Sequence, residues 1–285
     1  MKSITSNSVE VRRVAGALGA EILGADLSNG IDDTAFAAIH DAFLAHGVIF
    51  FRDQALTPEQ HLAFARRLGE IDVNKFFPTV EGYPEIAEVR KEPQDSRNIG
   101  GGWHTDHSYD AEPAKASMLY ALELPDYGGD TLFASMYAAY DALSDGMKRL
   151  LGRLNAVHSG RRAFGTDTTA SDEGLTAKFK RSEIAHAEVV HPVVVSHPET
   201  GRELLYVNPG FTVRFEDMTE EESRPLLDYL YQHAARPEFT CRFRWRPGSV
   251  ALWDNRSTHH FAVNDYSGQR RLMRRVTIQG GPLGP

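Results

Sequence analysis

The sequence predicts a mainly β fold with flanking helices, namely a double-stranded β-helix of the jelly-roll type. Many short runs rich in β-branched and aromatic residues are separated by turn-sized stretches. Only a few segments show helical spacing, so the pattern does not fit an alternating βαβ array with a parallel sheet. The chain has 285 residues, of which 41% are hydrophobic, so it can bury a sizeable core. We expect a single domain over residues 1–285.

The predicted strands extend from one end of the chain to the other. Val48-Ile49-Phe50-Phe51 is a continuous apolar run bounded by Gly47 and Arg52, which is typical of a buried strand. The predicted strands cover residues 9–15, 20–27, 47–52, 86–90, 116–122, 131–134, 187–196, 204–207, 240–245, 249–253 and 271–278.

Two helices are indicated by capping boxes. Thr57 is followed by a proline in the first turn and by Gln60 three residues on. Thr219 is followed in the same way by Glu222. Gly69 is the expected stop of the first helix. The two helices are expected over residues 57–68 and 219–234.

Three further helical stretches are expected. Phe36, Ile39 and Phe43 recur at helical intervals, and Asp33 or Thr34 is the expected cap of this helix. The other two stretches lie at 136–143 and 144–154.

Residues 161–183 form the longest predicted loop, because they are polar, rich in small residues and weakly patterned. A structureless stretch of this length inside a compact domain is usually a lid or disordered. Both alternatives stay open, and we place a lid or loop insertion at about 161–186.

Composition excludes several classes of protein. A formal net charge of -8 argues against a general nucleic-acid binder, whose surface would be basic. Cys241 is the only cysteine, so neither an internal disulfide framework nor a thiolate zinc cluster is available. No apolar run resembles a signal peptide or approaches the ~20 residues of a membrane span. We therefore expect a cytoplasmic protein whose partners include neither nucleic acid nor membrane.

The candidate chemistry centres on Gly100-Gly101-Gly102-Trp103-His104-Thr105-Asp106-His107. In an extended segment the side chains alternate, so His104 and Asp106 point the same way and Thr105 points away. With a second histidine, such a pair completes the arrangement of two histidines and one carboxylate that is typical of non-haem Fe(II) oxygenases. A lone His-x-Asp is also common as a hydrogen-bonded surface pair, so the motif alone leaves that alternative open.

The missing histidine and an arginine-rich strand lie downstream. Residues 252–262 begin as a strand and end in His259 and His260, followed by apolar residues. In the last predicted strand, Arg271, Met273 and Arg275 share one face. This face either meets water or points into a barrel mouth, where guanidinium groups bind carboxylates in bidentate fashion. At roughly 6.6 Å per alternate residue, the two arginines would lie about 13 Å apart, which fits two separate anions.

Taken together, these motifs are similar to those of the taurine dioxygenase (TauD/TfdA) family of Fe(II)- and 2-oxoglutarate-dependent oxygenases, which includes aryloxyalkanoate dioxygenases. The resemblance covers nearly the whole chain, from about residue 11 to residue 279. Its landmarks, in order, are Trp103-His104-Thr105-Asp106, Gly128-Gly129-Asp130-Thr131, Tyr206-Val207-Asn208, Trp253-Asp254-Asn255-Arg256 and the segment from His260 to Arg275.

The resemblance implies which residues bind the metal and the co-substrate. His104, Asp106 and His260 match the iron ligands, and His260 rather than His259 has the family offset from Trp253-Asp254-Asn255-Arg256. Because Asp106 is present, a halogenating variant, which needs that position free for halide, is not expected.

Arg271 matches the arginine that binds the distal carboxylate of 2-oxoglutarate, and Thr131 matches the hydroxyl that assists it. In the family, 2-oxoglutarate chelates Fe(II), O2 is consumed, succinate is released and the substrate is hydroxylated. The protein supplies geometry and excludes water, while the metal and the co-substrate carry the chemistry.

The substrate positions depart from the family pattern. Arg275 matches the arginine that binds the anionic end of the substrate in taurine dioxygenase. The histidine that assists it there is replaced by Asn74, with Lys75 beside it, and the tyrosine of the substrate loop by Phe77. His107 stands in place of a small apolar residue. An anionic substrate is therefore implied, whereas taurine itself is poorly supported.

The aromatic residues near these positions fit a larger pocket. Tyr109, Phe76 and Phe77 could line a site for an aromatic or extended acid, such as a sulfonate, an alkyl sulfate or an aryloxyalkanoate. Core packing of Phe76 and Phe77, and a supporting hydrogen bond from His107, are the alternatives. Hydroxylation next to an ether or sulfate oxygen gives an unstable product, so the net reaction could be cleavage.

Two other classes compete on the residues alone. Two histidines and a carboxylate can hold zinc in a hydrolase, but this leaves Thr131 and Arg271 unexplained. A non-catalytic sensor of organic acids would not need the full set of metal and co-substrate positions. Relatives are commonly dimers or tetramers, so we expect a homo-oligomer by analogy.

Overall fold

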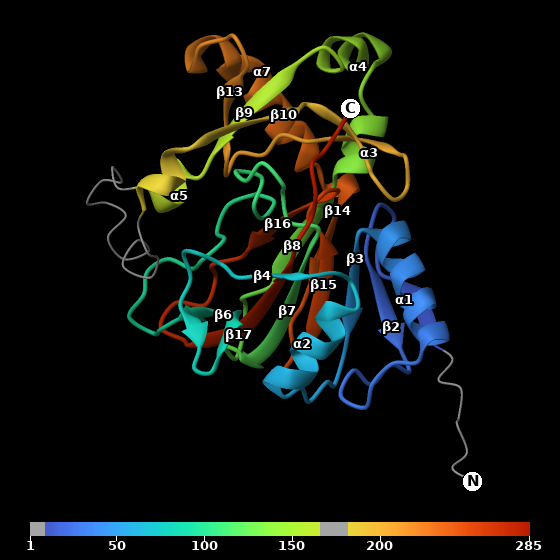
Figure 1. Cartoon of the computed structure of the whole chain (residues 1–285). Coiled ribbons are helices and arrows are strands. Elements are labelled where there is room, and N and C mark those ends of the chain that lie inside the picture. Colours follow the sequence, from blue (N-terminus) through green and yellow to red (C-terminus); the bar gives the residue numbers. More distant parts are fainter. Residues whose placement is uncertain (1–8, 166–181) are drawn as a thin grey trace.

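The structure is a computed structural model, and it describes residues 9–165 and 182–285 (Figure 1). Its main feature is a sandwich of two β-sheets, which confirms the predicted jelly-roll class. The large nine-stranded sheet has the order β1-β2-β3-β15-β7-β17-β6-β5, with β4 also paired to β17. The strands of this sheet are β1 (Glu10–Arg13), β2 (Ala20–Leu23), β3 (Val48–Phe51), β4 (Ile71–Asp72), β5 (Thr79–Val80), β6 (Tyr83–Lys91), β7 (Ala116–Glu123), β15 (Val250–Asp254) and β17 (Arg271–Ile278).

The second sheet faces the first and has the order β14-β8-β16. Its strands are β8 (Thr131–Ser135), β14 (Thr240–Phe243) and β16 (Thr258–Ala262). Aromatic rings fill the space between the sheets. The ring centroid of Phe50 on β3 lies 4.0 Å from that of Phe243 on β14, and Phe133 on β8 lies 5.7 Å from Trp253 on β15. This interface places the predicted metal-binding segments at one end of the sandwich.

Strand β3 shows why a continuous apolar run is needed in the large sheet. Val48 and Phe50 face the interior of the sandwich, whereas Ile49 and Phe51 face the opposite side. That outer face is covered by α1 (Asp33–His46) and α2 (Pro58–Arg66), as Figure 1 shows. All four side chains are therefore buried.

The helix boundaries test the capping predictions. The capping box at Thr57 is confirmed, since Thr57 and Gln60 bond each other's backbone reciprocally. The helix ends at Arg66 rather than Leu68, because the backbone N–H groups of Arg67 and Leu68 bond three residues back and tighten the last turn. The predicted cap of α1 is wrong: Asp32 is the cap, and its carboxylate accepts from the backbone N–H of Ala35.

A third layer lies above the sandwich in Figure 1 and has its own apolar core. It contains a sheet of order β10-β9-β13 and the hairpin of β11 and β12. These strands are β9 (Asn155–Ser159), β10 (Glu188–Pro192), β11 (Val194–Ser196), β12 (Glu203–Leu205) and β13 (Thr212–Phe215). The helices of this layer are α3 (Met136–Asp141), α4 (Asp145–Leu151), α5 (Arg161–Phe164) and α7 (Glu220–Ala234), with 3-10 turns η2 (Glu183–His186) and η3 (Pro237–Phe239).

Several predictions in this layer need correction. The single strand expected at 187–196 is two strands, because β10 pairs with β9 whereas β11 pairs with β12. The stretch expected to be a loop from residue 161 begins with the short helix α5, which packs near η2. Residues 166–181 of the expected lid lie outside the described residues. The capping box at Thr219 is confirmed.

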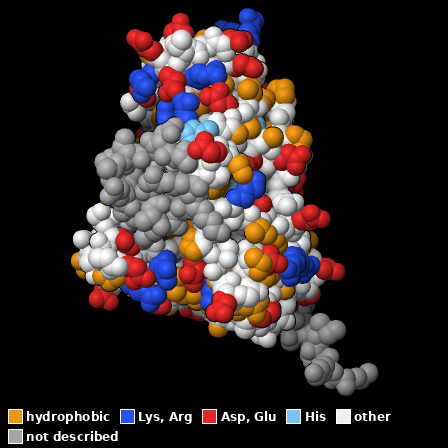
Figure 2. Space-filling model, turned by 60° about the vertical axis from the view of Figure 1, so that its left-hand side comes forward, with side chains coloured by type: hydrophobic (Ala, Val, Ile, Leu, Met, Phe, Trp, Pro, Cys, Tyr) orange, Lys and Arg blue, Asp and Glu red, His pale blue; other side chains and the backbone are white. Residues whose placement is uncertain are grey.

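The surface agrees with the charge composition. On the described part of the face in Figure 2, acidic and basic side chains are interspersed, and apolar side chains are scattered. Within residues 9–165 and 182–285, no helix has the length and apolar character needed to cross a membrane.

His61 on α2 is a buried titratable group, and its burial predicts acid sensitivity. Its side chain is 1% exposed, and neither ring nitrogen makes a well-formed hydrogen bond to the described residues. Burial lowers the pKa of His61 to about 4, and the backbone of Met118 offsets this only in part. Because the unfolded chain binds this proton near pH 6.5 and the folded chain does not, stability is lost as the pH falls from about 6.5 towards 4.

We therefore expect His61→Leu to lose less stability on acidification than the native chain. With about 1.4 kcal/mol per pKa unit, the difference between the two proteins should approach ~3 kcal/mol by pH 4. Urea unfolding at pH 7.5 and at pH 4, with chelator present to remove metal effects, measures it. Equal losses in both proteins would show that His61 does not contribute.

Candidate metal centre and active-site cavity

Three potential metal ligands converge at one end of the sandwich. His104 and His260 pair across an isolated β-bridge, in which each backbone N–H bonds the other's carbonyl at 3.1 and 2.8 Å. Asp106 Oδ1 lies 3.8 Å from Nε2 of His104 and 4.0 Å from Nε2 of His260. One ligand atom from each residue lies within 4.8 Å of the others. Two histidines and one carboxylate in this arrangement fit a divalent transition metal and leave coordination sites open.

Two glycines let the backbone approach His104 closely. Gly100 has φ +78°, and a Cβ at this position would lie 3.2 Å from Cε1 of His104. A Cβ at Gly210, in the loop before β13, would lie 2.8 Å from Cβ of His104. The glycine loop that precedes the His-Thr-Asp segment is therefore part of the site geometry rather than a generic linker.

The protonation of the three residues suits a metal. Nδ1 of His104 lies 2.7 Å from the carbonyl of Gly102, which assigns the proton to Nδ1 and the lone pair to Nε2. Burial lowers the pKa of His104 and lowers that of His260 well below its ordinary value, so both rings are neutral. Burial would raise the pKa of Asp106, but the charge of Arg275, whose Nη1 lies 3.1 Å from Oδ1, outweighs it and holds that pKa well below its usual range. Neutral imidazoles and an ionised carboxylate are the forms that bind metal.

Arg271 lies beside the ligand set without an anion of its own. It borders a cavity of about 40 Å³ that His104, His260 and Thr131 also line. The side chain is 4% exposed, and Nε and one Nη have no hydrogen-bond partner among the described residues. Burial lowers the pKa of the guanidinium, and the nearby Tyr266 and Asp130 offset this only in part. A buried, unpaired guanidinium fits a carboxylate from a ligand.

The hydroxyl of Thr131 can donate a hydrogen bond to the same anion. Its Oγ1 accepts a hydrogen bond of 2.9 Å from the indole Nε1 of Trp245. Because an indole N–H can only donate, the hydroxyl hydrogen of Thr131 remains to be donated elsewhere. A ligand carboxylate between the two side chains would accept from this hydroxyl and from Arg271.

The arginine face of β17 points inward, so the alternative in which it meets water is wrong. Arg275 is 7% exposed, and its Nη1 donates to Oδ1 of Asp106 at 3.1 Å. Its guanidinium lies 4.5 Å from the ring centroid of Phe77, as a cation-π pair. The face is buried because it points into the sandwich, where Met273 on the same face belongs to one apolar cluster with Phe133 and Trp253.

A cavity of about 540 Å³ opens next to the ligand set. Of the predicted substrate residues, Arg275, Tyr109 and Phe77 line this cavity. Its wall also contains Phe164 of α5 and Phe211, which sequence reasoning missed. Among the described residues, the lining is Phe77, 97–103, His104, Asp106, Tyr109, 162–164, 209–211, Asn264 and Arg275.

Phe164 and Phe211 carry little signal in the sequence. The ring of Phe164 stacks on Phe76 at 4.3 Å, and Tyr109 packs edge-on against Phe211 at 4.8 Å. Phe211 follows a turn in which the side chain of Asn208 accepts from the Phe211 backbone N–H, so the asparagine was its only local clue. Phe164 lies in a weakly patterned stretch and reaches the site only through tertiary packing.

The other predicted substrate residues lie behind the cavity wall. Oδ1 of Asn74 accepts from the backbone N–H groups of Phe76 and Phe77, and its Nδ2 lies 3.3 Å from Nε2 of His107. Nδ1 of His107 lies 2.9 Å from Asp110. Lys75 and His107 border a separate cavity of about 130 Å³. Asn74 and His107 thus shape the loop that carries Phe77 and do not line the large cavity.

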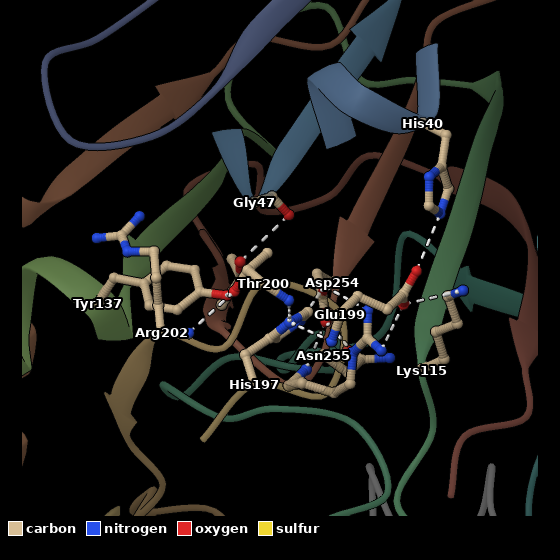
Figure 3. A network of polar contacts seen from close by, with 12 residues as sticks. His40, Gly47, Lys115, Tyr137, His197, Glu199, Thr200, Arg202, Asp254 and Asn255 are labelled. Carbon is tan, nitrogen blue, oxygen red and sulfur yellow. Dashed lines mark hydrogen bonds and ion pairs between the residues drawn. The ribbon is translucent and has the colours of Figure 1, made fainter. Parts of the chain in front are cut away.

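A buried ionic network supports the turn between β15 and β16 (Figure 3). Arg256 donates twice to Asp254 at 2.8 Å, and His197 Nε2 lies 2.9 Å from the same carboxylate. Glu199 pairs with Arg256 at 2.7 Å and with Lys115 at 3.1 Å. The network joins the sandwich to the turn between β11 and β12, which explains why the Trp253-Asp254-Asn255-Arg256 motif is charged yet buried.

Known proteins resemble this chain over nearly its whole length. A family model described as "Taurine catabolism dioxygenase TauD, TfdA family" matches residues 10–277. An alkylsulfatase of Acinetobacter baylyi is 36% identical over 278 residues, covering 96% of this chain and 86% of the relative. An alpha-ketoglutarate-dependent sulfate ester dioxygenase of Pseudomonas putida is also 36% identical, covering 97% of this chain and 91% of the relative.

A solved structure supports the fold assignment. The crystal structure of a putative alpha-ketoglutarate-dependent taurine dioxygenase from Burkholderia xenovorans has a TM-score of 0.82 and 37% sequence identity to this chain. The likeness covers 98% of this chain and 95% of that one. The double-stranded β-helix predicted from the sequence is thus confirmed by topology and by comparison.

Proposed function

The chain belongs to the taurine catabolism dioxygenase TauD/TfdA family, and from this premise we propose that His104, Asp106 and His260 hold Fe(II). We also propose that Arg271 and Thr131 hold 2-oxoglutarate. The protein is an oxidoreductase, a dioxygenase that uses Fe(II), 2-oxoglutarate and O2. The observation that best supports the residue roles is the buried guanidinium of Arg271 beside the converging ligand set. Its Nε and one Nη have no hydrogen-bond partner within the described part of the chain.

The residues of the chain have separable tasks in this reaction. When bound, iron and 2-oxoglutarate supply the oxidative chemistry that hydroxylates the substrate with O2. Arg271 and Thr131 orient the co-substrate through its distal carboxylate, and Arg275 orients the substrate through its anionic group. The rings of Phe77, Tyr109 and their neighbours keep water out of the cavity and hold the apolar part of the substrate.

We propose that the substrate is a small organic anion with an apolar tail, and an alkyl sulfate ester is the first candidate. Arg275 offers a buried positive charge inside a cavity whose wall carries several aromatic rings, which suits an anionic head joined to an apolar chain. These rings belong to Phe77, Trp103, Tyr109, Phe164 and Phe211. Two relatives are named for sulfate esters or alkyl sulfates. Hydroxylation at the carbon that bears the ester oxygen would yield an unstable product, which breaks down to an aldehyde and inorganic sulfate. Sulfonates and aryloxyalkanoates are the alternative substrates.

A substrate screen tests this proposal. Succinate release would be measured with Fe(II), O2 and 2-oxoglutarate in the presence of alkyl sulfates, sulfonates such as taurine, and aryloxy acids. We expect substrate-dependent release with medium-chain alkyl sulfates and much less with taurine. Release with none of these anions would contradict the substrate class.

Arg275→Ala is expected to raise the KM for the substrate by about 10- to 100-fold, because a charged hydrogen bond is worth about 1.5–3 kcal/mol. The KM for 2-oxoglutarate is the internal control, since Arg271 is unchanged. Arg275→Lys, which keeps the charge but loses the planar fork, should fall between the two proteins. An unchanged KM for the substrate in Arg275→Ala would show that the anion binds elsewhere.

The zinc hydrolase and the organic-acid sensor are not favoured, since the named relatives are dioxygenases. By analogy with the family, we propose that the enzyme works in the cytoplasm as a dimer or tetramer. Sedimentation of the purified protein measures the oligomeric state.

A further inference from the structure

The two carboxylate oxygens of Asp106 have different surroundings. Oδ1 faces Nε2 of both histidines and Nη1 of Arg275. Oδ2 points away from them and accepts a 2.7 Å hydrogen bond from the hydroxyl of Ser117 on β7. Oδ1 therefore lies toward the two histidines, where Arg275 also donates to it, whereas Oδ2 is held by Ser117.

The hydrogen bond from Ser117 is the last of a series of three hydrogen bonds. The donor and acceptor of each bond can be assigned in only one way. The indole Nε1 of Trp253 can only donate, and it donates to Oδ1 of Asn255 at 2.8 Å. This assigns the amide nitrogen of Asn255 to the other side, where it donates to Oγ of Ser117 at 3.0 Å. Because Ser117 accepts this bond, its own hydrogen remains for Oδ2 of Asp106.

The residues of this hydrogen-bond series are also buried. Exposed fractions are 2% for Trp253, 1% for Asn255, 0% for Ser117 and 5% for Asp106. The backbone of Asn255 is also held, since its N–H donates to the carbonyl of Lys115 at 3.0 Å. In Figure 3, Asn255 lies within the ionic network, and its neighbours Asp254 and Arg256 bond each other directly.

We propose that Ser117 is a positioning residue for the metal site, and that the chain from Trp253 through Asn255 and Ser117 restricts Asp106 to coordination through Oδ1 alone. The proposal rests on the proposed function, because it needs a metal at the ligand set. With Asp106 bound through one oxygen, the three residues would supply three ligand atoms to a metal and leave its other positions to the co-substrate and O2. A carboxylate free to turn could bind through both oxygens and occupy one of these sites.

Mn(II) binding by native protein and by Ser117→Ala tests the proposal. Loss of a hydrogen bond to a ligating carboxylate typically weakens metal binding by 10- to 100-fold, so we expect at least a ~10-fold higher Kd in Ser117→Ala. In the anaerobic Fe(II) complex with 2-oxoglutarate, the charge-transfer band should also shift, because Asp106 is no longer held in one orientation.

Ser223→Ala is the matched control. Ser223 is also 0% exposed, and its hydroxyl bonds the backbone of Phe215 and Thr219 in the third layer, away from the ligand set. This variant should lose similar stability and keep the native Kd and band position. A native Kd and band in Ser117→Ala would overturn the proposal while the metal site stands. Absence of binding by the native protein would instead defeat the proposed function, and the positioning role with it.

Discussion

Asp106→Ala is expected to abolish coupled turnover of 2-oxoglutarate and substrate. The substitution removes the only carboxylate of the ligand set and leaves the buried charge of Arg275 without its partner. A bound metal supplies several kcal/mol of stabilisation to a reaction, and a loss of about 4 kcal/mol corresponds to a ~1000-fold lower rate. Metal affinity should fall by more than the 10- to 100-fold typical of losing one supporting hydrogen bond.

The matched variant is Asp106→Asn, which keeps the shape and the possibility of a bond with Ser117 but removes the charge. Initial rates of succinate release and Mn(II) titrations of the three proteins measure both effects, and circular dichroism checks that each is folded. If Asp106→Ala retained the native metal affinity and rate, the ligand assignment would be wrong.

Arg271→Ala should raise the KM for 2-oxoglutarate by at least about 10- to 150-fold, because charge-assisted hydrogen bonding to a carboxylate is worth about 1.5–3 kcal/mol per bond. The same substitution should not lower the stability of the ligand-free protein. Arg271 is buried with unpaired guanidinium nitrogens among the described residues, so its removal should leave the apo-protein at least as stable as before. Stabilisation by added 2-oxoglutarate and metal should largely disappear.

Arg274→Ala is the control for this pair of effects, since Arg274 lies on the opposite face of the same strand and does not line the cavity of Arg271. Thermal unfolding with and without 2-oxoglutarate and Mn(II), together with steady-state kinetics, separates binding from stability. An Arg271→Ala protein with native KM, or one that is strongly destabilised without ligand, would contradict the assigned role.

Parts of the fold were predictable because they depend on interactions between residues close together in the sequence. The capping boxes at Thr57 and Thr219 depend on side chains three residues apart, so they can be read directly from the sequence. The strand β16 was missed because Thr258–Ala262 has two histidines at its centre and no apolar alternation. It is a strand because it pairs with β8 along its whole length, and this pairing is not encoded locally.

The candidate site, too, was predictable from the sequence only in part. The face of β17 that carries Arg271 and Arg275 follows from strand periodicity, but only the fold decides that this face is buried. Asn74 was expected at the substrate, yet its amide holds the backbone of the Phe76–Phe77 loop. Phe164 reaches the cavity from a helix of the third layer, and no spacing rule connects it to the His-Thr-Asp segment.

The most direct test of the account is an anaerobic titration of the Fe(II)-loaded native protein with 2-oxoglutarate. The account predicts a weak visible charge-transfer band that saturates at one equivalent per chain. The band should be absent from Asp106→Ala, and much weaker in Arg271→Ala at the lowest 2-oxoglutarate concentration that saturates the native protein. Well-folded, metal-loaded native protein that develops no band would contradict the assignment of these residues to iron and 2-oxoglutarate.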